Sequence, residues 1–249
     1  MNIVLSGING FMGKEEMTAA EKTGAASTIG LDVKPDPTCP VPTAKTFLEA
    51  DAYLSTRLAG CVIDFSHHAA TVDLVDFAKR NRLPLVIATT GQTEEERAYI
   101  EAAAKEIPVF FAANYALGVA LLAELAKKTA AAFPNSEIEI VEKHHSRKID
   151  APSGTALMLA NAIKSVRPEC VEHCGRSGIC KRTPNEIGIH SIRMGNIVGE
   201  HEVIVHAGSQ SITKKHEAYS RALFAEGALA AAKWLIGKPA GLYTMSDLI

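Results

Sequence analysis

Short apolar runs alternate with segments of helical period over the first 115 residues of the chain. The runs are too short for core helices and end at glycine or polar residues, so we expect them to be buried strands. These expected strands are residues 2–6, 27–33, 61–65, 83–89 and 108–112. The segments of helical period between them are residues 13–22, 69–81 and 93–105. Alternation of strands and helices predicts a parallel sheet with helices on both faces.

The pattern changes after residue 115. Residues 136–143 alternate polar and apolar side chains, which is typical of a half-exposed strand in an antiparallel or mixed sheet. Residues 169–186 are polar, and we expect them to be irregular. The other expected elements are helices at residues 116–133, 153–166 and 222–236 and strands at residues 188–194 and 201–206. The predicted fold class is α/β, with an α/β domain first and an α+β domain with an open mixed sheet second.

Length and charge restrict the possible function classes. A chain of 249 residues suits one large domain or two modest ones with a real core. The net charge of -2 gives no global attraction to nucleic acid or to an anionic membrane, and no apolar run approaches the ~20 residues of a membrane span. The first residues, MNIVLSGING, lack a basic segment and a cleavage site. We therefore expect a cytoplasmic protein without a nucleic-acid or membrane partner.

The five cysteines do not form a recognisable pattern. Cys170, Cys174 and Cys180 cluster in a polar stretch with His173 nearby, which makes a zinc site conceivable. No CxxC spacing is present, however, and we expect free thiols in a loop and no bound metal.

Three glycines, Gly7, Gly10 and Gly13, follow the first expected strand with the spacing GxxGxxG. Glycine lets the backbone turn tightly and approach a pyrophosphate at the N-terminus of a helix. Asp32 ends the second expected strand, where a ribose-binding acid belongs. The common fingerprint is GxGxxG, so a plain glycine-rich turn with an exposed aspartate is the alternative. Lys34 could pair with the 2′-phosphate of NADP, which leaves the choice between NADH and NADPH open.

Small residues end two later expected strands, at residues 89–91 (TTG) and 112–115 (AANY). Ligands of parallel α/β sheets bind at the carboxyl ends of the strands, and small side chains there would let a nicotinamide ring approach the backbone. An ordinary change from strand to loop explains these residues equally well.

Cations are concentrated in residues 143–148, KHHSRK, which lie between Glu142 and Asp150. A solvated surface is the ordinary explanation of such a charge run. This run ends an expected strand, however, and adjacent residues on an extended chain point to opposite sides. One of His144 and His145 can therefore face a cleft, and the alternation does not say which. Metal binding by the pair is disfavoured because their side chains diverge.

A helix start follows directly, in the run DAPSGTA. Ser153 is a good N-cap, and Gly154 and Thr155 would present backbone N–H groups to a carboxylate or phosphate. Ser153 is disfavoured as a nucleophile because the chain has no GxSxG elbow there. The permanent cation of Lys148 and the near-neutral titration of His144 suit a small anionic substrate whose reaction needs proton transfer.

Four blocks of the chain carry a resemblance to one enzyme family. The blocks are GINGFMGK at residues 7–14, VIDFS and ATTG within residues 62–91, AANYALGV and EIVEKHHSRKIDAPSGTA within residues 112–156, and GNIVGEHEV at residues 195–203. The third block is the most specific, and the tail with Arg221, Gly227 and Trp234 also fits. The chain resembles the 4-hydroxy-tetrahydrodipicolinate reductases, also called dihydrodipicolinate reductases, of bacterial lysine and diaminopimelate biosynthesis.

The resemblance implies NADH- or NADPH-dependent reduction of (hydroxy)dihydrodipicolinate, a small dicarboxylate, to tetrahydrodipicolinate. It implies a Rossmann-like dinucleotide-binding domain at residues 1–115 and 222–249 and a substrate-binding and oligomerisation domain at residues 116–221 of a homotetramer. Hydride would add to the conjugated imine of the substrate. The charge that builds toward the ring nitrogen would be stabilised by nearby cationic or protonating groups.

The family's site residues carry over to matching positions of this chain. The proton-donor positions are His144 and Lys148, and the substrate-binding positions are His145, Gly154 and Thr155. The expected cofactor-binding positions, to which Lys34 is added for its charge, are Gly7, Ile8, Asn9, Gly10, Phe11, Met12, Asp32, Lys34, Thr89, Thr90, Gly91, Ala112, Ala113, Asn114 and Tyr115.

Three residues depart from the family pattern, and none belongs to the expected catalytic cluster. Ala88 stands where glycine usually precedes TTG, Met194 replaces a common glycine, and His67 stands where some members have an arginine. The last departure puts a phosphate contact in doubt. Two competing functions are a nicotinamide-dependent oxidoreductase acting on another small anionic imine and a non-catalytic NAD-binding sensor.

Overall fold

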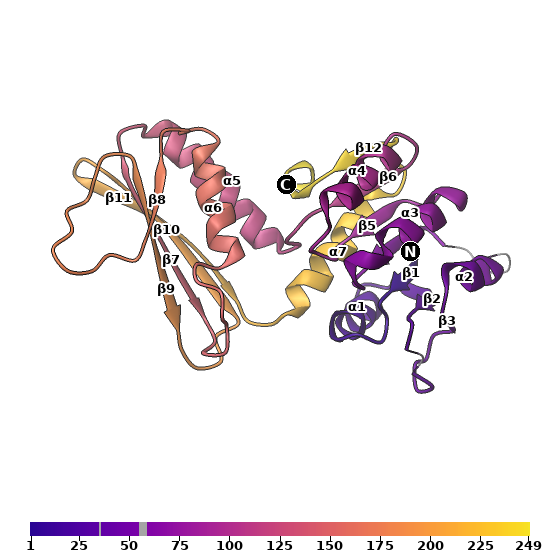
Figure 1. Ribbon diagram of the computed structural model, residues 1–249. Helices are drawn as coiled ribbons and strands as arrows, with labels where there is room; N and C mark the ends of the chain where they lie inside the picture. The colour runs from indigo at the N-terminus through magenta and orange to yellow at the C-terminus, as the bar shows by residue number, and fades with distance from the viewer. Residues whose placement is uncertain (35, 55–58) are drawn as a thin grey trace. The chain divides into compact units, whose positions relative to one another are not determined.

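The computed structural model describes residues 1–34, 36–54 and 59–249. Its described part consists of two compact units (Figure 1). Unit 1 comprises Met1–Ala116 and Ala222–Ile249, and unit 2 comprises Leu117–Arg221. The final segment of the chain therefore contributes to the same core as its beginning.

Unit 1 is built on a parallel sheet. Among the described residues this sheet has seven strands in the order β12-β6-β5-β4-β1-β2-β3, and all neighbouring strands pair in parallel. The strands are β1 (Asn2–Ser6), β2 (Ala26–Leu31), β3 (Thr43–Ala44), β4 (Cys61–Asp64), β5 (Leu85–Ile87), β6 (Pro108–Phe111) and β12 (Gly241–Tyr243). The order changes direction between β1 and β4, and ligands of α/β sheets bind at such a switch point.

Helices cover both faces of this sheet, as expected. The helices are α1 (Phe11–Lys22), α2 (Phe47–Leu54), α3 (Thr71–Arg80), α4 (Glu94–Ala103), α7 (Ala222–Leu235) and α8 (Met245–Leu248), with the short 3-10 helix η1 (His68–Ala70) before α3. Val4, Val62 and Leu85 share a core with α3 and α4. Helices α1 and α7 contact each other, and α7 also contacts β4, β5 and β6. Because side chains alternate along a strand, the residues that face α3 and α4 differ from those that face α1 and α7.

Unit 2, all of whose residues are described, has a five-stranded mixed sheet in the order β11-β10-β7-β9-β8. Its elements are α5 (Leu117–Ala132), β7 (Glu137–His144), α6 (Gly154–Lys164), β8 (Val171–Cys174), β9 (Glu186–Arg193), β10 (Gly199–Ala207) and β11 (Gln210–Ala218). Strand β7 pairs parallel with β9 and antiparallel with β10. The fold class is therefore the expected one, a Rossmann-like α/β unit followed by a unit with an open mixed sheet.

One face of the second sheet packs against α5 and α6. Ile138 and Ile140 on β7 are buried there among side chains from both helices. The same alternation places Glu142 and His144 on this face, at the carboxyl end of the strand. The expected half-exposed strand thus carries its polar end residues on its buried face.

Several elements were not expected from the sequence. The polar stretch 169–186 contains strand β8, so its prediction as wholly irregular is wrong. Strand β11, with the sequence QSITKKHEA, is an edge strand with no fully buried residue, which hides its period. The short elements β3, α2, β12 and α8 contain too few residues to show a period.

The structure also bears on two wider expectations. No helix within the described ranges is long and apolar enough to cross a membrane. All five cysteines are free thiols, with Cys61 and Cys170 buried and Cys174 and Cys180 exposed.

Candidate active site

The glycine turn after β1 needs its glycines for steric reasons. Gly7 has φ of +79°, and a Cβ at this position would lie 2.5 Å from the carbonyl oxygen of Phe65. A Cβ on Gly13 would lie 2.3 Å from the carbonyl oxygen of Gly7. Gly10 is the N-cap of α1, so the turn leads directly into the start of that helix. The first N–H groups and the dipole of a helix favour an anion at such a position.

Asp32 lies directly after β2 and closes this turn. Its Oδ2 accepts the backbone N–H of Asn9 at 3.0 Å, and its Oδ1 accepts the backbone N–H of Lys34 at 2.9 Å. The side-chain amide of Asn9 donates to the carbonyl oxygen of Lys34 at 2.6 Å. The carboxylate therefore fixes the turn and lies at the edge of a cavity next to it.

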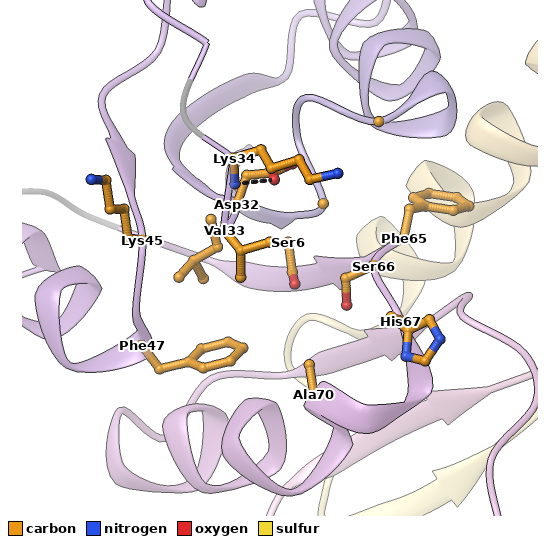
Figure 2. Close-up of a pocket in the computed structure, with 13 residues that line it drawn as sticks. Ser6, Asp32, Val33, Lys34, Lys45, Phe47, Phe65, Ser66, His67 and Ala70 are labelled. Atoms are coloured by element: carbon orange, nitrogen blue, oxygen red, sulfur yellow. Dashed lines mark hydrogen bonds between the residues drawn. The ribbon is translucent and has the colours of Figure 1, made fainter.

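This cavity has a volume of about 340 Å³ (Figure 2). It contains an acid suited to ribose hydroxyls, Asp32, and two lysines suited to a phosphate, Lys34 and Lys45. Phe47 supplies an aromatic face, and Figure 2 shows it with Lys45 at one end of the cavity and His67 at the other. The donor set fits the adenosine half of either NADH or NADPH.

The sequence did not point to Lys45, Phe47 or Ala70 as cavity residues. Lys45 and Phe47 come from the segment around β3 and the start of α2, which pairing with β2 brings beside Asp32. Ala70 belongs to η1, which follows the β4 end. No local motif marks these residues, because only the strand order of the sheet makes them neighbours.

A second cavity of about 230 Å³ lies at the carboxyl ends of β5 and β6. It joins two of the expected segments, and its lining is Thr89, Thr90, Gly91, Gln92, Arg97, Phe111, Ala112 and Ala113. Gln92 is only 7% exposed and donates to the carbonyl oxygen of Thr89 at 2.9 Å. Gln92 and Arg97 were not singled out in the sequence. Small residues leave space here that a nicotinamide ring could fill.

Tyr115 and Asn114 do not line that cavity. The Tyr115 side chain is buried, and its hydroxyl donates toward the carbonyl oxygens of Ile87 and Phe110 at 2.9 and 3.1 Å. Burial raises the pKa of Tyr115 well above its ordinary value. Asn114 Oδ1 accepts the backbone N–H of Ala116 at 2.8 Å. The Tyr115 side chain thus bridges two strand ends, and a contact between this segment and the cofactor stays a prediction.

In unit 2, the end of β7 carries a group of buried polar residues. Glu142 has no exposed surface and His144 is 9% exposed. His144 Nδ1 lies 2.5 Å from Glu142 Oε2. The His144 ring packs edge-on against the His201 ring, with 5.1 Å between the two ring centroids. Burial lowers the pKa of His144 below its usual 6.5, although the neighbouring Glu142 opposes this shift.

The expected N-cap of the following helix is present. Ser153 Oγ accepts the backbone N–H of Ala156 at 3.2 Å, which begins α6 at Gly154. Ser153 Oγ also lies 3.2 Å from His201 Nε2. A Cβ on Gly154 would meet nothing within 4 Å, so the start of α6 is open to an approaching group. The capping interpretation of Ser153 is thus confirmed.

The basic segment between the strand and the helix forms a turn. Lys148 Nζ pairs with Asp150 Oδ1 at 2.7 Å, and the Lys148 backbone N–H donates to the carbonyl oxygen of His145. Strand β7 ends at His144, so His145 already lies in this turn. The expectation that the two histidines point to opposite sides therefore stays a prediction, because only His144 belongs to the strand.

Three further residues complete the group and were not singled out in the sequence. Arg193 on β9 reaches Glu142 with both terminal nitrogens, at 2.7 and 2.8 Å. His201 lies directly opposite Glu142 in the pairing of β10 with β7. A Cβ on Gly199 would lie 3.1 Å from His144 Nε2. The GNIVGEHEV block contains two of these residues, but only the sheet register shows what they contact.

No group of three or more His, Cys, Asp or Glu side chains that could hold a metal occurs among the described residues. The candidate groups in unit 2 are a carboxylate-bound histidine, a lysine and a helix N-terminus, and unit 1 has a cavity suited to a nucleotide. A parallel sheet with a glycine turn, joined to a mixed-sheet unit, defines the class of two-domain proteins with a Rossmann-type fold.

Comparison with known proteins gives the family. A model described as "Dihydrodipicolinate reductase, N-terminus" matches residues 1–115, and one described as "Dihydrodipicolinate reductase, C-terminus" matches residues 118–249. The chain belongs to the dihydrodipicolinate reductase family.

Relatives of similar length support this assignment. Proteins of Caldanaerobacter subterraneus and Clostridium novyi, both named 4-hydroxy-tetrahydrodipicolinate reductase, are 46% and 43% identical to this chain. The alignments cover 100% and 99% of this chain and 98% and 97% of the relatives.

Solved structures show the same fold. A dipicolinate-bound dihydrodipicolinate reductase from Paenisporosarcina sp. TG-14 matches with a TM-score of 0.85 at 24% identity, covering 100% of this chain and 99% of that one. A probable dehydrogenase from Thermotoga maritima matches with a TM-score of 0.65 at 11% identity, covering 100% and 92%.

Proposed function

We propose that this chain catalyses the NAD(P)H-dependent reduction of (hydroxy)dihydrodipicolinate to tetrahydrodipicolinate in lysine and diaminopimelate biosynthesis. Full-length relatives at 46% and 43% identity bear the name of this activity. The observation that carries the proposal is the buried group at the end of β7, where His144 and the start of α6 meet on Glu142. A protonating group tied to an anion-binding helix start suits a ring that carries carboxylates and gains a proton.

Unit 1 would bind the cofactor. The turn from Gly7 to Met12 and the N-terminus of α1 would hold the pyrophosphate, and Asp32 would accept hydrogen bonds from the adenine ribose. Thr89, Thr90, Gly91, Ala112 and Ala113 line the cavity proposed for the nicotinamide end. The bound cofactor supplies the hydride.

Unit 2 would bind and protonate the substrate. The N-terminus of α6, at Gly154 and Thr155, would fix one carboxylate, and His145 would contact the ring or its second carboxylate. Lys148 and protonated His144 would stabilise the negative charge that builds toward the ring nitrogen. Burial lowers the pKa of His144. The negative charges of a bound dianion would raise this pKa again, so substrate binding would favour protonation of the histidine.

The decisive experiment measures the absorbance loss of NADH and of NADPH with enzymatically generated substrate. We expect turnover with both cofactors, since the adenosine cavity contains an acid and two lysines. Turnover only with a different cyclic imine in a substrate panel would favour the alternative oxidoreductase. Cofactor binding without turnover of any imine would favour a sensor and contradict the proposal.

We further propose that the chain assembles as a homotetramer through the second face of the unit 2 sheet. On this face, Val141, Ile192 and Ile204 alternate with the core-facing residues, and Ile192 is 37% exposed. Ion pairs such as Lys143–Glu200 lie beside them. Light scattering should give four times the 26.6 kDa chain mass, and Ile192→Lys should reduce it. A monomeric wild-type protein would contradict this assembly, and a cytoplasmic location stays a prediction.

A further inference from the structure

Glu142 is a buried carboxylate with donors on both oxygens. Oε2 lies 2.5 Å from His144 Nδ1 and 2.8 Å from an Arg193 nitrogen. Oε1 accepts from the other Arg193 nitrogen at 2.7 Å and from the backbone N–H of Ser153 at 3.1 Å. One side chain therefore contacts the proposed proton donor and the start of the helix proposed to bind the substrate carboxylate.

We propose that Glu142 is a positioning residue that keeps the proton of neutral His144 on Nδ1, leaves Nε2 for the substrate and ties the histidine to the start of α6. An ionised carboxylate only accepts hydrogen bonds, so the ring nitrogen that faces it must donate. The tautomer of a histidine is set by the hydrogen bond that its other nitrogen makes. The substrate assignment in this inference rests on the proposed function, but the tautomer does not.

The charge state of Glu142 supports the inference. Burial alone would raise the pKa of this carboxyl group. Hydrogen bonds from Arg193, Ser191, His144 and the Ser153 backbone oppose burial and lower the pKa to about 2. Glu142 is thus ionised throughout the neutral range and cannot donate to His144.

A glycine beside the histidine ring keeps side-chain atoms away from Nε2 of His144. Gly199 lies beside it, and a Cβ there would come within 3.1 Å of Nε2. The His201 ring packs edge-on against His144 and reaches Ser153 Oγ with its own Nε2. His201 therefore supports the ring from the neighbouring strand, and burial lowers its pKa to about 4, so it adds no charge at neutral pH.

Several charged groups act on the titration of His144. Glu142 on β7 raises its pKa, while Arg193 on β9 and Lys148 in the turn lower it. His201 on β10 also faces it, and His216 on β11 lies directly opposite His201. Since Glu142 is the stabilising partner of the protonated ring, its removal should lower the pKa of His144 further.

A direct test reads the tautomer without any catalysis. The full-length protein is labelled with ¹⁵N-histidine, and the His144 signals are assigned by comparison with His144→Gln. At pH 8 we expect Nδ1 to show the shift of a protonated nitrogen and Nε2 that of an unprotonated one. In Glu142→Gln the Nε2-protonated form should become populated. A wild-type ring protonated on Nε2 would overturn the inference, as would an unchanged tautomer in Glu142→Gln.

A kinetic test separates positioning from a purely structural role. Glu142→Gln should lower kcat by roughly 10- to 10⁴-fold, the range seen when an orienting group of a functional histidine is lost. NADH affinity should not change, because the expected cofactor residues lie in unit 1. The pH above which activity falls should move downward. A lower kcat with an unmoved pH profile would indicate only structural damage and contradict positioning.

Two further variants keep this test decisive. Glu172→Gln removes a carboxylate of the same unit that pairs with Lys164 at 3.0 Å, and it should leave kcat and the pH profile unchanged. Arg193→Lys keeps one charge but loses the bidentate contact with Glu142, and it should lower kcat less than Glu142→Gln does. If the wild-type protein does not reduce the proposed substrate, the proposed function fails while the tautomer measurement still decides this inference.

Discussion

Each unit contains a glutamate without any exposed surface, and the two carboxyl groups differ in their hydrogen-bond partners. Glu16, on α1 of unit 1, has no hydrogen-bond partner on either carboxyl oxygen among the described residues. Glu142, on β7 of unit 2, has donors on both oxygens. Burial raises the pKa of Glu16 to about 9, whereas the donors around Glu142 overcome burial and lower its pKa to about 2.

The difference shows that donors, rather than burial, decide whether a buried acid is charged. Glu16 stays protonated at neutral pH and is a core residue whose carboxyl oxygens lack hydrogen bonds to the described residues. Glu142 stays ionised and organises the polar groups around it. The two acids should also give the two units opposite responses to pH, because one binds a proton on folding and the other releases one.

The largest expected effect comes from removing the paired acid. Glu142→Ala leaves Arg193 and the Ser153 N–H without their partner, and breaking a buried pair in this way costs about 3–5 kcal/mol. Urea unfolding and hydrogen exchange over β7 and β9 measure this loss. Glu172→Ala, which breaks a half-exposed pair, should cost about 1 kcal/mol or less. Equal losses in the two variants would refute the special role of Glu142.

The charged groups of unit 2 should affect the chemical step. Lys148→Ala removes a cation proposed to stabilise the charge at the ring nitrogen, and we expect kcat to fall by about 10²–10³-fold. NADH binding, followed by fluorescence titration, should stay at the wild-type level. Near-wild-type turnover would exclude Lys148 from the reaction.

His144→Gln should change the pH dependence of the rate. The variant lacks the titrating proton donor, so we expect a loss of roughly 10²-fold at the optimum. The fall in kcat/KM with rising pH should disappear as well. A pH profile with the wild-type midpoint would show that another group titrates.

Glu16→Gln tests the unpaired acid. The folded-state pKa of Glu16, about 9, lies above its ordinary value of 4.5, so stability falls as pH rises between these values. The loss is roughly 1.4 kcal/mol for each pH unit, and Glu16→Gln should remove it. The fluorescence of the single tryptophan, Trp234 on α7, reports the unfolding of unit 1. An alkaline stability loss of the same size in the variant would assign it to another group.

The smallest expected effect is on cofactor choice. Lys34 lines the adenosine cavity and could pair with a 2′-phosphate, but Lys45 lines the same cavity. Lys34→Ala should therefore weaken NADPH binding only severalfold, about 1 kcal/mol, and leave NADH binding unchanged. Isothermal titration of both cofactors checks this, and equal weakening of the two would show that Lys34 does not contact the phosphate.

Sequence patterns predicted the central strands and long helices closely, because a buried strand or an amphipathic helix repeats its signal over several residues. Strand β1 covers the expected residues 2–6, and the final long helix starts at the expected residue 222. The edge strands β8 and β11 were missed because they lack a buried face that would show as a period. Tyr115 was expected near the cofactor from its place after a strand, and only the structure shows that its hydroxyl lies between two strand ends.

By itself, the sequence determined the local parts of this protein. Each of these parts consists of one residue or a few residues close together in the chain, and its chemistry follows from residue type and spacing. The parts are the glycine turn, the acid after β2, the N-cap Ser153 and the cations before α6. These features act through backbone geometry and helix ends, which a short segment specifies.

Only the tertiary structure decided which distant side chains share a site. Arg193 and His201 lie far along the chain from Glu142, and the pairing of β9 and β10 with β7 brings them to it. The same holds for Lys45 and Phe47, which reach Asp32 through β3. Sheet register sets these contacts, and register depends on how whole strands bury their faces rather than on any local motif.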